Sequence, residues 1–304
     1  LANACSSDRC QLFTMFSVIV MTTTSFSSRY ARLANGVSMP FVNLGGVSSS
    51  PSNYSAFLEL GGRGLDTALT YGDAIQRDIA AAITQSTVPR EDIFLTTKVP
   101  CCPEAWGGDC AKPEFSKGVA ANIALDVKIL GSIDLLLLHW PCAGVDAVED
   151  TLAAWRGLEA ALNAGVTRAI GVSNFNASFL ETLLPRMKTK PAVNQCGHSI
   201  GNTQNTLNGG DDRTVEWCQA NGISYSAYSP LGGLSGIDIL KNLDVLAIAH
   251  AHTVSAAQVA LRWLVQQNIS VVTAASNPAY IREDIDVFSF VLTPAEMATL
   301  ARIR

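Results

Sequence analysis

Charged residues are scarce in this sequence, and basic residues are not in excess. Only 15% of the 304 residues are charged, and 21 Lys and Arg stand against 26 Asp and Glu, for a formal net charge of −5. An ordinary soluble chain has roughly 25% charged residues. A surface that binds nucleic acid or an anionic membrane needs clustered positive charge. We therefore expect neither nucleic acid nor a membrane among the partners of this protein.

Long hydrophobic runs are also missing. The longest apolar run near the start, Leu12–Met21, contains a Thr and is too short to span a bilayer. Yet 48% of the residues are hydrophobic, so most of the chain has a core to bury and we do not expect it to be disordered. A chain of this length holds either two average domains or one large barrel.

The cysteines lack the spacing of a zinc site. There are eight of them and no CxxC pair, so we expect no bound metal and no disulfide scaffold. Cys101, Cys102 and Cys110 share one loop rich in Pro and Gly. We expect free thiols in a reducing compartment, and a local redox switch between the loop thiols is the alternative.

Acidic residues are absent from Arg9 to Leu58, and a run of Ser and Thr precedes Arg29 and Arg32. An acid-poor segment with Ser and Arg is typical of an organelle transit peptide. Translated upstream sequence and an unstructured terminus are alternative explanations of the same composition. We therefore set residues 1–29 apart as a leader or disordered segment. The expected location is cytoplasmic, with organelle import as the alternative.

Residues 30–304 alternate short apolar runs with helical patterns, and we expect them to form one domain. A continuous apolar run such as Leu135–Leu138 is what a parallel sheet covered by helices requires. Eight strand-and-helix units fit a closed (β/α)₈ TIM barrel. No GxGxxG follows a strand and no Walker A motif is present, which argues against doubly wound nucleotide-binding domains. The expected strands are Phe41–Leu44, Gly64–Asp66, Ile93–Lys98, Ile133–His139, Ala169–Ser173, Ala192–Gln195, Ser224–Tyr228 and Ser270–Thr273.

A hairpin is expected before the barrel. Asn35 and Gly36 separate two short apolar runs, Ala31–Leu33 and Val37–Met39. An Asn-Gly pair between such runs indicates a β-hairpin with a two-residue turn.

Polar residues end six of the predicted strands. Because the chemistry of a (β/α)₈ barrel belongs at the C-terminal ends of its strands, these residues are candidates for a site. They are Asp66, Lys98, His139, Ser173 with Asn174, Gln195 and Tyr228.

Tyr71 follows Asp66 by five residues and completes a candidate proton-transfer site. A tyrosine has an ordinary pKa of about 10, and a nearby lysine ammonium favours its phenolate. A carboxylate behind Lys98 would keep that lysine charged, and His139 could orient the oxygen that is protonated. Singly, each residue has a structural explanation such as a loop cap, a snorkelling lysine or a core histidine. Together, at the strand ends, they favour a site.

Several ordered motifs resemble the aldo-keto reductase family from about Leu33 to the C-terminus. The resemblance implies a (β/α)₈ barrel that binds a nicotinamide cofactor without a Rossmann domain. The motifs are Gly64–Gly72, Pro89–Lys98, Ile133–Pro141, Ala169–Phe175, Val193–Gln195 and Ala227–Gly232.

The resemblance assigns a role to each matching residue. Tyr71 would be the general acid, Lys98 and Asp66 would tune it, and His139 would orient the carbonyl. An aromatic face suits a flat heterocycle, and amide and hydroxyl groups suit a carboxamide. The implied cofactor-binding residues are Ser173, Asn174 and Gln195 for the carboxamide, Tyr228 for the ring, and Ser229, Leu231 and Gly232 for the pyrophosphate.

The chain departs from the family beside the eighth strand. The family usually places a Lys before the serine and an Arg after it, for the 2′-phosphate of NADPH. Here Ala275 precedes Ser276, and Tyr280 stands near the expected Arg. Arg282 could substitute, although acidic residues follow it, and fixed cations make the strong phosphate contacts. We expect NADPH as the cofactor, with NADH as the alternative.

A further departure and an enlarged loop concern the substrate pocket. The segment after His139 is short, whereas the loop after Lys98 is enlarged and carries Trp106. Because aromatic residues often line small-molecule sites, we expect Trp106 and Trp140 to contact substrate; burial of Trp106 against the rim is the alternative.

These observations predict a monomeric NAD(P)H-dependent aldehyde or ketone reductase that acts on a small carbonyl compound. A catalytically idle barrel, binding nicotinamide cofactor as a regulatory or sensor subunit, is the alternative from another class. A barrel isomerase without cofactor is a third.

Overall fold

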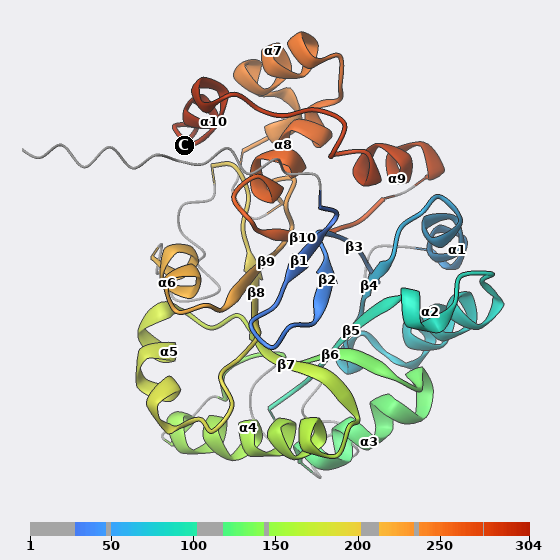
Figure 1. Cartoon of the computed structure of the whole chain (residues 1–304), viewed down its shortest axis with the longest axis vertical. Helices are drawn as coiled ribbons and strands as arrows, with labels where there is room; N and C mark the ends of the chain where they lie inside the picture. Colours follow the sequence, from blue (N-terminus) through green and yellow to red (C-terminus); the bar gives the residue numbers. More distant parts are fainter. Residues whose placement is uncertain are drawn as a thin grey trace, which may run out of the picture.

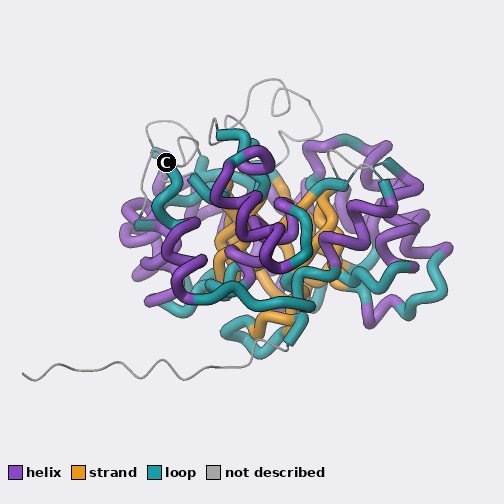
Figure 2. The backbone as a smooth tube through the Cα atoms, turned by 90° about the horizontal axis from the view of Figure 1, so that it is seen from above, coloured by secondary structure: helices purple, strands orange, loops and turns teal. Residues whose placement is uncertain are grey.

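Eight parallel strands close into a barrel, with helices around it (Figure 1). The computed structural model describes residues 28–46, 50–101, 118–142, 146–201, 213–233, 237–275 and 277–304. Viewed from above, the strands form the centre and helices flank them (Figure 2). The predicted (β/α)₈ fold is confirmed. The barrel strands are β3 Val42–Gly45, β4 Gly64–Asp66, β5 Phe94–Val99, β6 Ile133–Leu138, β7 Thr167–Ser173, β8 Val193–Gly197, β9 Ser224–Tyr228 and β10 Ser270–Thr273, in the order β10-β3-β4-β5-β6-β7-β8-β9.

The helices follow the apolar periodicity of the sequence. In the longest described helix, Leu152, Trp155 and Leu158 are buried against the barrel. Ser255 and Thr293 each begin a helix with a capping box, which satisfies backbone N–H groups of the first turn. The α-helices are α1 Pro51–Glu59, α2 Asp73–Gln85, α3 Val119–Leu130, α4 Ala147–Asn163, α5 Ala177–Leu183, α6 Thr214–Ala220, α7 Leu243–His252, α8 Ala256–Val265, α9 Pro278–Ile285 and α10 Pro294–Leu300. Short 3₁₀ turns are η1 Leu69–Tyr71, η2 Arg90–Asp92, η5 Leu184–Arg186 and η7 Ile239–Lys241.

The N-terminal hairpin pairs β1 Tyr30–Arg32 with β2 Ser38–Pro40, as predicted. Its turn is longer than the predicted two residues, because Leu33 N–H donates to Val37 O across 2.8 Å and encloses three residues. Gly36 has a φ of 84°, and a three-residue hairpin turn needs this left-handed conformation at its last position.

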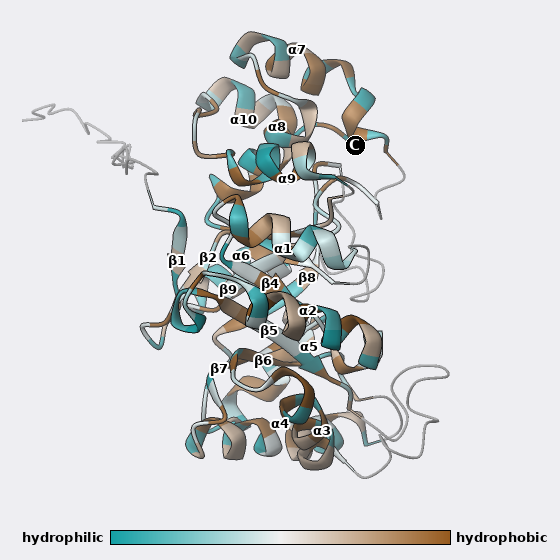
Figure 3. Cartoon of the chain, turned by 90° about the vertical axis from the view of Figure 1, so that its right-hand side faces the viewer, coloured by the Kyte–Doolittle hydropathy of each residue, from teal (hydrophilic) through white to brown (hydrophobic). Residues whose placement is uncertain are grey.

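The hairpin closes one end of the barrel (Figures 1 and 3). Leu33 and Met39 are buried and pack against side chains that point into the barrel, including Leu135 and Leu137. Leu136 belongs instead to the layer between the barrel and the helices, as the alternation of side chains along a strand requires. The core therefore has an inner and an outer layer, and the open end of the barrel is the end opposite the hairpin.

The cysteine prediction is wrong in part, because Cys101 and Cys142 form a disulfide. Their Cα atoms lie 5.3 Å apart, since β5 and β6 are neighbours and each cysteine follows the end of one strand. Cys196 and Cys218 are buried free thiols, as expected. Cys102 and Cys110, and with them the alternative of a switch in that loop, lie outside the described residues.

Membrane-spanning helices and metal sites can be assessed among the described residues alone. None of the described helices combines the length and the apolar character that crossing a membrane requires. Within the described ranges, no cluster of His, Cys, Asp and Glu could hold a metal ion. The predicted leader falls almost wholly on residues 1–27, which lie outside these ranges.

Candidate active site

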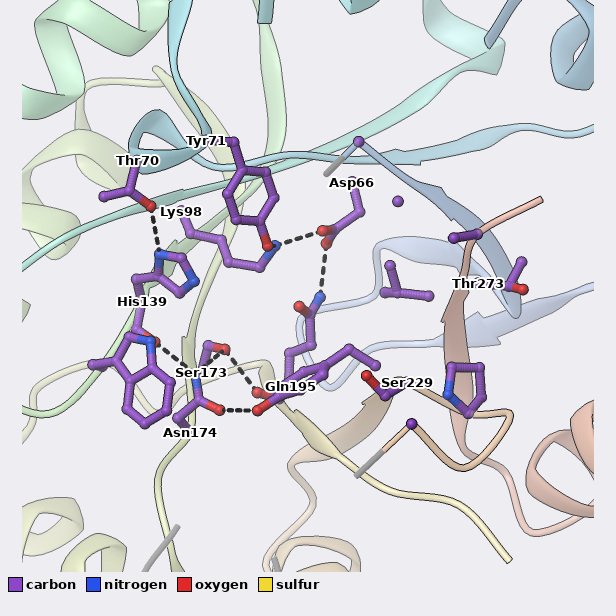
Figure 4. A pocket seen from close by; sticks show the side chains of 18 of the residues that line it. Asp66, Thr70, Tyr71, Lys98, His139, Ser173, Asn174, Gln195, Ser229 and Thr273 are labelled. Atoms are coloured by element: carbon purple, nitrogen blue, oxygen red, sulfur yellow. Dashed lines mark hydrogen bonds and ion pairs between the residues drawn. The ribbon is translucent and has the colours of Figure 1, made fainter. Parts of the chain in front are cut away.

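A cavity of about 670 Å³ opens at the C-terminal ends of the barrel strands, at the end opposite the hairpin. Most of the predicted site residues line it and point toward one another (Figure 4). Its described lining residues are Gly45, Gly46, Asp66, Thr70, Tyr71, Lys98, His139, Trp140, Ser173, Asn174, Gln195, Tyr228, Ser229, Pro230, Leu231, Gly233, Val272, Thr273 and Ala274.

Lys98 is the centre of the polar wall of the cavity. Its Nζ lies 2.5 Å from Asp66 Oδ1 and 2.9 Å from the carbonyl oxygen of Thr67. It also donates to the hydroxyl of Tyr71 across 3.4 Å. The ammonium therefore donates to a carboxylate, a carbonyl and the phenol; Figure 4 shows Lys98 between Asp66 and Tyr71.

The charge of Lys98 is held by its neighbours. Burial by itself lowers the pKa of this lysine, but Asp66 and Tyr71 raise it more, and the net pKa is above the ordinary value. Gln195 Nε2 donates to the second oxygen of Asp66 across 2.7 Å. Both oxygens of the Asp66 carboxylate therefore accept a hydrogen bond, and the two bonds fix the orientation of the carboxylate.

His139 is neutral at ordinary pH. Burial, and to a smaller extent the charge of Lys98, lower the pKa of this imidazole well below 6.5. Its Nδ1 lies 3.3 Å from Oγ1 of Thr70, and its ring meets that of Tyr71 edge to face, with centroids 5.9 Å apart. A neutral imidazole next to a phenol can donate one hydrogen bond into the cavity without adding a charge.

A second polar group follows the strands β7, β8 and β9. Asn174 Nδ2 donates to the carbonyl oxygen of His139 and to Ser173 Oγ, at 3.0 and 3.1 Å. The Ser173 hydroxyl donates to the carbonyl oxygen of Gln195 across 2.8 Å, and the Tyr228 hydroxyl donates to Asn174 Oδ1 across 2.7 Å. Burial, and then the neighbouring Cys196, raise the pKa of Tyr228, so this phenol stays protonated.

Two residues of the cavity wall have left-handed backbone conformations. Asn174 has a φ of 65° and Ser229 a φ of 51°, which costs a residue other than glycine roughly 1–2 kcal/mol. Strained backbone of this kind clusters at ligand sites, where the surrounding hydrogen bonds hold it. The network around Asn174 is consistent with this.

Four of the predicted site residues do not line the cavity or cannot be placed. A Cβ on Gly232 would meet Ile239 rather than the cavity, and Arg282 is exposed on α9. Trp106 and Ser276 lie outside the described residues. The roles assigned to these four residues stay predictions.

Several residues that line the cavity were not among the predicted site residues. Thr273 ends β10, and the rule that found the other strand ends would have found it too. Thr70 directly precedes Tyr71, but its contact with His139 depends on the 3₁₀ turn η1, which no pattern predicts. Gly45 and Gly46, at the end of β3, gave no chemical signal.

The side chains of the second polar group fit a nicotinamide carboxamide. The carboxamide needs both acceptors and a donor. Asn174 Oδ1 accepts from Tyr228 alone among the described residues, and an amide oxygen can accept two hydrogen bonds. The Ser173 hydroxyl can rotate, and Gln195 Oε1 supplies a further acceptor. The ring of Tyr228 offers an aromatic face beside them.

Comparison with known proteins points to one family. The model of the Aldo/keto reductase family matches residues 50–304. The glyoxal reductase of Bacillus subtilis (strain 168) is 34% identical over 271 residues, which cover 88% of this chain and 89% of that protein. The 9,11-endoperoxide prostaglandin H2 reductase of Trypanosoma cruzi (strain CL Brener) is 35% identical over 271 residues, with coverage of 87% and 88%.

Solved structures agree with these relatives. MGS-M4, an aldo-keto reductase enzyme from a Medee basin deep-sea metagenome library, superposes with a TM-score of 0.77 at 31% identity, over 90% of this chain and 94% of that one. The aldo-keto reductase AKR2E5 of the silkworm, Bombyx mori, complexed with NADPH, superposes with a TM-score of 0.75 at 29% identity, over 90% and 87%.

Proposed function

Because this chain belongs to the aldo/keto reductase family of oxidoreductases, we propose that it reduces an aldehyde or ketone with NADPH, and that Tyr71 is the general acid. The observation that carries this proposal is the contact of the Tyr71 hydroxyl with the Lys98 ammonium at the wall of an open cavity. A bound reduced nicotinamide supplies the hydride. The barrel supplies the position and the proton.

Tyr71 donates its hydroxyl proton to the carbonyl oxygen as that oxygen gains negative charge. The ammonium of Lys98 stabilises the phenolate that remains, since an adjacent positive charge favours the ionised form. Asp66 keeps Lys98 protonated and in place. A tyrosine without these partners would be a poor acid at neutral pH.

His139 orients the carbonyl group. If the Thr70 hydroxyl donates to Nδ1, the proton of the neutral imidazole is on Nε2. That N–H then donates to the carbonyl oxygen and directs its lone pair toward Tyr71. The positioning requires no change of charge on His139.

Ser173, Asn174 and Gln195 would hold the carboxamide of a bound nicotinamide, and the ring of Tyr228 would offer it an aromatic face. For the pyrophosphate we propose Ser229, Leu231 and Gly232, of which the first two line the cavity. For the 2′-phosphate of NADPH we propose Ser276 and Arg282. Among the described lining residues Lys98 is the only permanent cation, so discrimination between NADPH and NADH rests on groups outside the cavity wall.

The substrate we propose is a small uncharged carbonyl compound. Trp140, Pro230 and Leu231 give part of the cavity an apolar wall, and Trp106 would add to it. The charge of Lys98 is already balanced by Asp66, and the other described residues that line the cavity include no Lys or Arg that could attract a carboxylate or phosphate substrate. The relatives named above as reductases of glyoxal and of a prostaglandin endoperoxide show that the family accepts differing substrates.

The direct test is to incubate the whole chain with NADPH and a nitrobenzaldehyde and follow the loss of nicotinamide absorbance. The proposal predicts turnover, and a parallel titration with NADPH and NADH gives the cofactor preference. Quenching of Trp fluorescence by the cofactor without turnover would favour the idle barrel, which has no need of the Tyr71, Lys98, Asp66 and His139 set. The mass of the protein in solution tests the predicted monomer.

A further inference from the structure

A buried carboxyl group stands behind the barrel wall, outside the cavity. Asp126 on α3 is fully buried. Its Oδ2 accepts from the hydroxyl of Thr97 across 2.7 Å, and its Oδ1 accepts from Nε2 of Gln76. Both partners are fully buried as well. The mechanism proposed above uses none of the three.

Burial of an ionised carboxyl group costs free energy because the group loses its hydration. Burial raises the pKa of Asp126 to about 7, although the hydrogen bonds from Thr97 and Gln76 and the charge of Lys98 all lower it. A buried carboxyl is tolerated only when its hydrogen bonds are made. The two partners of Asp126 belong to different elements, Gln76 to α2 and Thr97 to β5. Helix α2 begins two residues after Tyr71, and strand β5 contains Lys98.

The position of Thr97 is coupled to the position of Lys98 through strand β5. The two residues are neighbours on β5, and successive side chains of a strand point to opposite faces. Lys98 therefore points into the cavity while Thr97 points outward to α3. A shift of Thr97 relative to α3 carries Lys98 with it.

The position of Gln76 is coupled to the position of Tyr71 through the start of α2. Its backbone N–H donates to the carbonyl oxygen of Gly72 across 3.3 Å, and Gly72 directly follows Tyr71. Gly72 has a φ of 98°, a conformation that only glycine adopts readily. The chain thus turns sharply at Gly72 into α2, which begins at Asp73, and the Asp126 contact holds Gln76 near the start of this helix.

We propose that Asp126 is a positioning residue that ties α2 to β5 and thereby holds the Tyr71 hydroxyl within hydrogen-bond distance of Lys98 Nζ. This distance is 3.4 Å, near the limit at which a hydrogen bond persists. A relative shift of α2 and β5 by a fraction of an ångström breaks the contact on which proton donation depends. The inference rests on the proposed role of Tyr71 and Lys98.

The test compares Asp126→Ala with Asp126→Asn. Alanine removes both contacts. Asparagine keeps them, because its oxygen can accept from Gln76 and its NH₂ group can donate to the Thr97 hydroxyl, which both donates and accepts. The rate of hydride transfer in a single turnover with NADPH and a nitrobenzaldehyde isolates the chemical step from product release.

We expect Asp126→Ala to slow this single-turnover rate about 10-fold to 100-fold with the affinity for NADPH within about twofold of the wild type. We expect Asp126→Asn to restore the rate to within about threefold of the wild type. All rates are taken well below the unfolding midpoint of each variant. A normal rate in Asp126→Ala shows a purely structural role and overturns the proposal. An Asp126→Asn rate as slow as that of Asp126→Ala overturns it too, since the charge would then be what matters.

Asp134→Ala is the matched control. Asp134, at the start of β6, is also a buried aspartate that accepts a hydrogen bond from β5, in this case from Leu95 N–H across 2.9 Å. It lies at the end of the barrel away from the cavity. We expect this variant to lose stability but to keep its single-turnover rate; an equal loss of rate would mean that any damage to β5 suffices.

Thr97→Val carries the test if Asp126→Ala fails to fold. Valine keeps the shape of the side chain and removes only the hydroxyl that bonds Asp126. We expect a slower single-turnover rate in the same direction, and an unchanged rate contradicts the proposal. If the wild type itself reduces no carbonyl compound, the proposed function fails, which is a different result from a wild type that is active and variants that are unaffected.

Discussion

The ammonium of Lys98 lies 2.5 Å from Oδ1 of Asp66, and each side chain is only 2% exposed. A buried charge is stable only next to a partner that replaces its hydration. The pair therefore places a fixed positive charge beside the Tyr71 hydroxyl, at the one end of the barrel that the hairpin leaves open.

Replacement of Asp66 is predicted to shift the pH dependence of the reaction. Burial lowers the pKa of Lys98 and Asp66 raises it, so Asp66→Asn lets burial dominate and the pKa of Lys98 falls. The alkaline limb of kcat/KM should then move to lower pH by about one unit or more. A pH–rate profile measures this shift, with the exposed Asp92→Asn as the control. An unmoved alkaline limb would show that Asp66 does not set the charge of Lys98.

Thr70 is predicted to control which nitrogen of His139 carries the proton. Thr70→Val removes the hydroxyl that lies 3.3 Å from Nδ1, and the imidazole can then adopt the other tautomer. We expect a lower kcat with an unchanged affinity for NADPH, because the carbonyl is held less well while the cofactor site is intact. Steady-state kinetics with a cofactor titration separates the two effects. A weakened affinity for NADPH with normal kcat would place Thr70 in the cofactor site instead.

The disulfide between Cys101 and Cys142 is predicted to stabilise the folded protein. Cys101 and Cys142 are 41 residues apart in the sequence, and a loop of this size gives about 2–4 kcal/mol. Replacement of both by Ala should lower the free energy of unfolding in urea by that amount. A strong reductant should destabilise the wild type similarly and leave the double variant unchanged. If the reductant affects both proteins equally, the disulfide is not the cause.

The carboxyl of Asp126 is predicted to make stability depend on pH. Its pKa in the folded protein is about 7, against 3.8 ordinarily, so between these values the folded state binds more protons than the unfolded state. The free energy of unfolding therefore falls as pH rises from about 4 to about 7. Asp126→Asn lacks this contribution, and its stability relative to the wild type should increase over that range by up to about 4 kcal/mol. Urea unfolding of both proteins at several pH values measures the difference, and a constant difference would refute the prediction. Asp284, also buried with a raised pKa of about 7, is present in both proteins and cancels.

The sequence predicted the barrel well because its strands are continuous apolar runs that end in polar residues. Asp66, Lys98 and His139 could be assigned to one end of the barrel from their strand positions alone. Distances could not be predicted, since the bond between Gln195 and Asp66 joins residues 129 positions apart.

Features that depend on contacts between side chains of different elements were not predictable. The Thr70–His139 contact depends on the turn η1, and the Cys101–Cys142 disulfide on how two loops leave neighbouring strands. Asp126 looks like any other helical aspartate in the sequence. Only the packing of α3 against α2 and β5 reveals that it is buried.

Tyr71→Phe tests most directly whether Tyr71 donates the proton. The phenyl ring keeps the shape of the side chain and removes only the hydroxyl that contacts Lys98. The measurement is turnover of a nitrobenzaldehyde with NADPH, together with the dissociation constant of NADPH from Trp fluorescence. We predict that kcat falls by about 10²–10⁴ while the dissociation constant is nearly unchanged. Turnover close to that of the wild type would contradict the account, because the acid would then be another group.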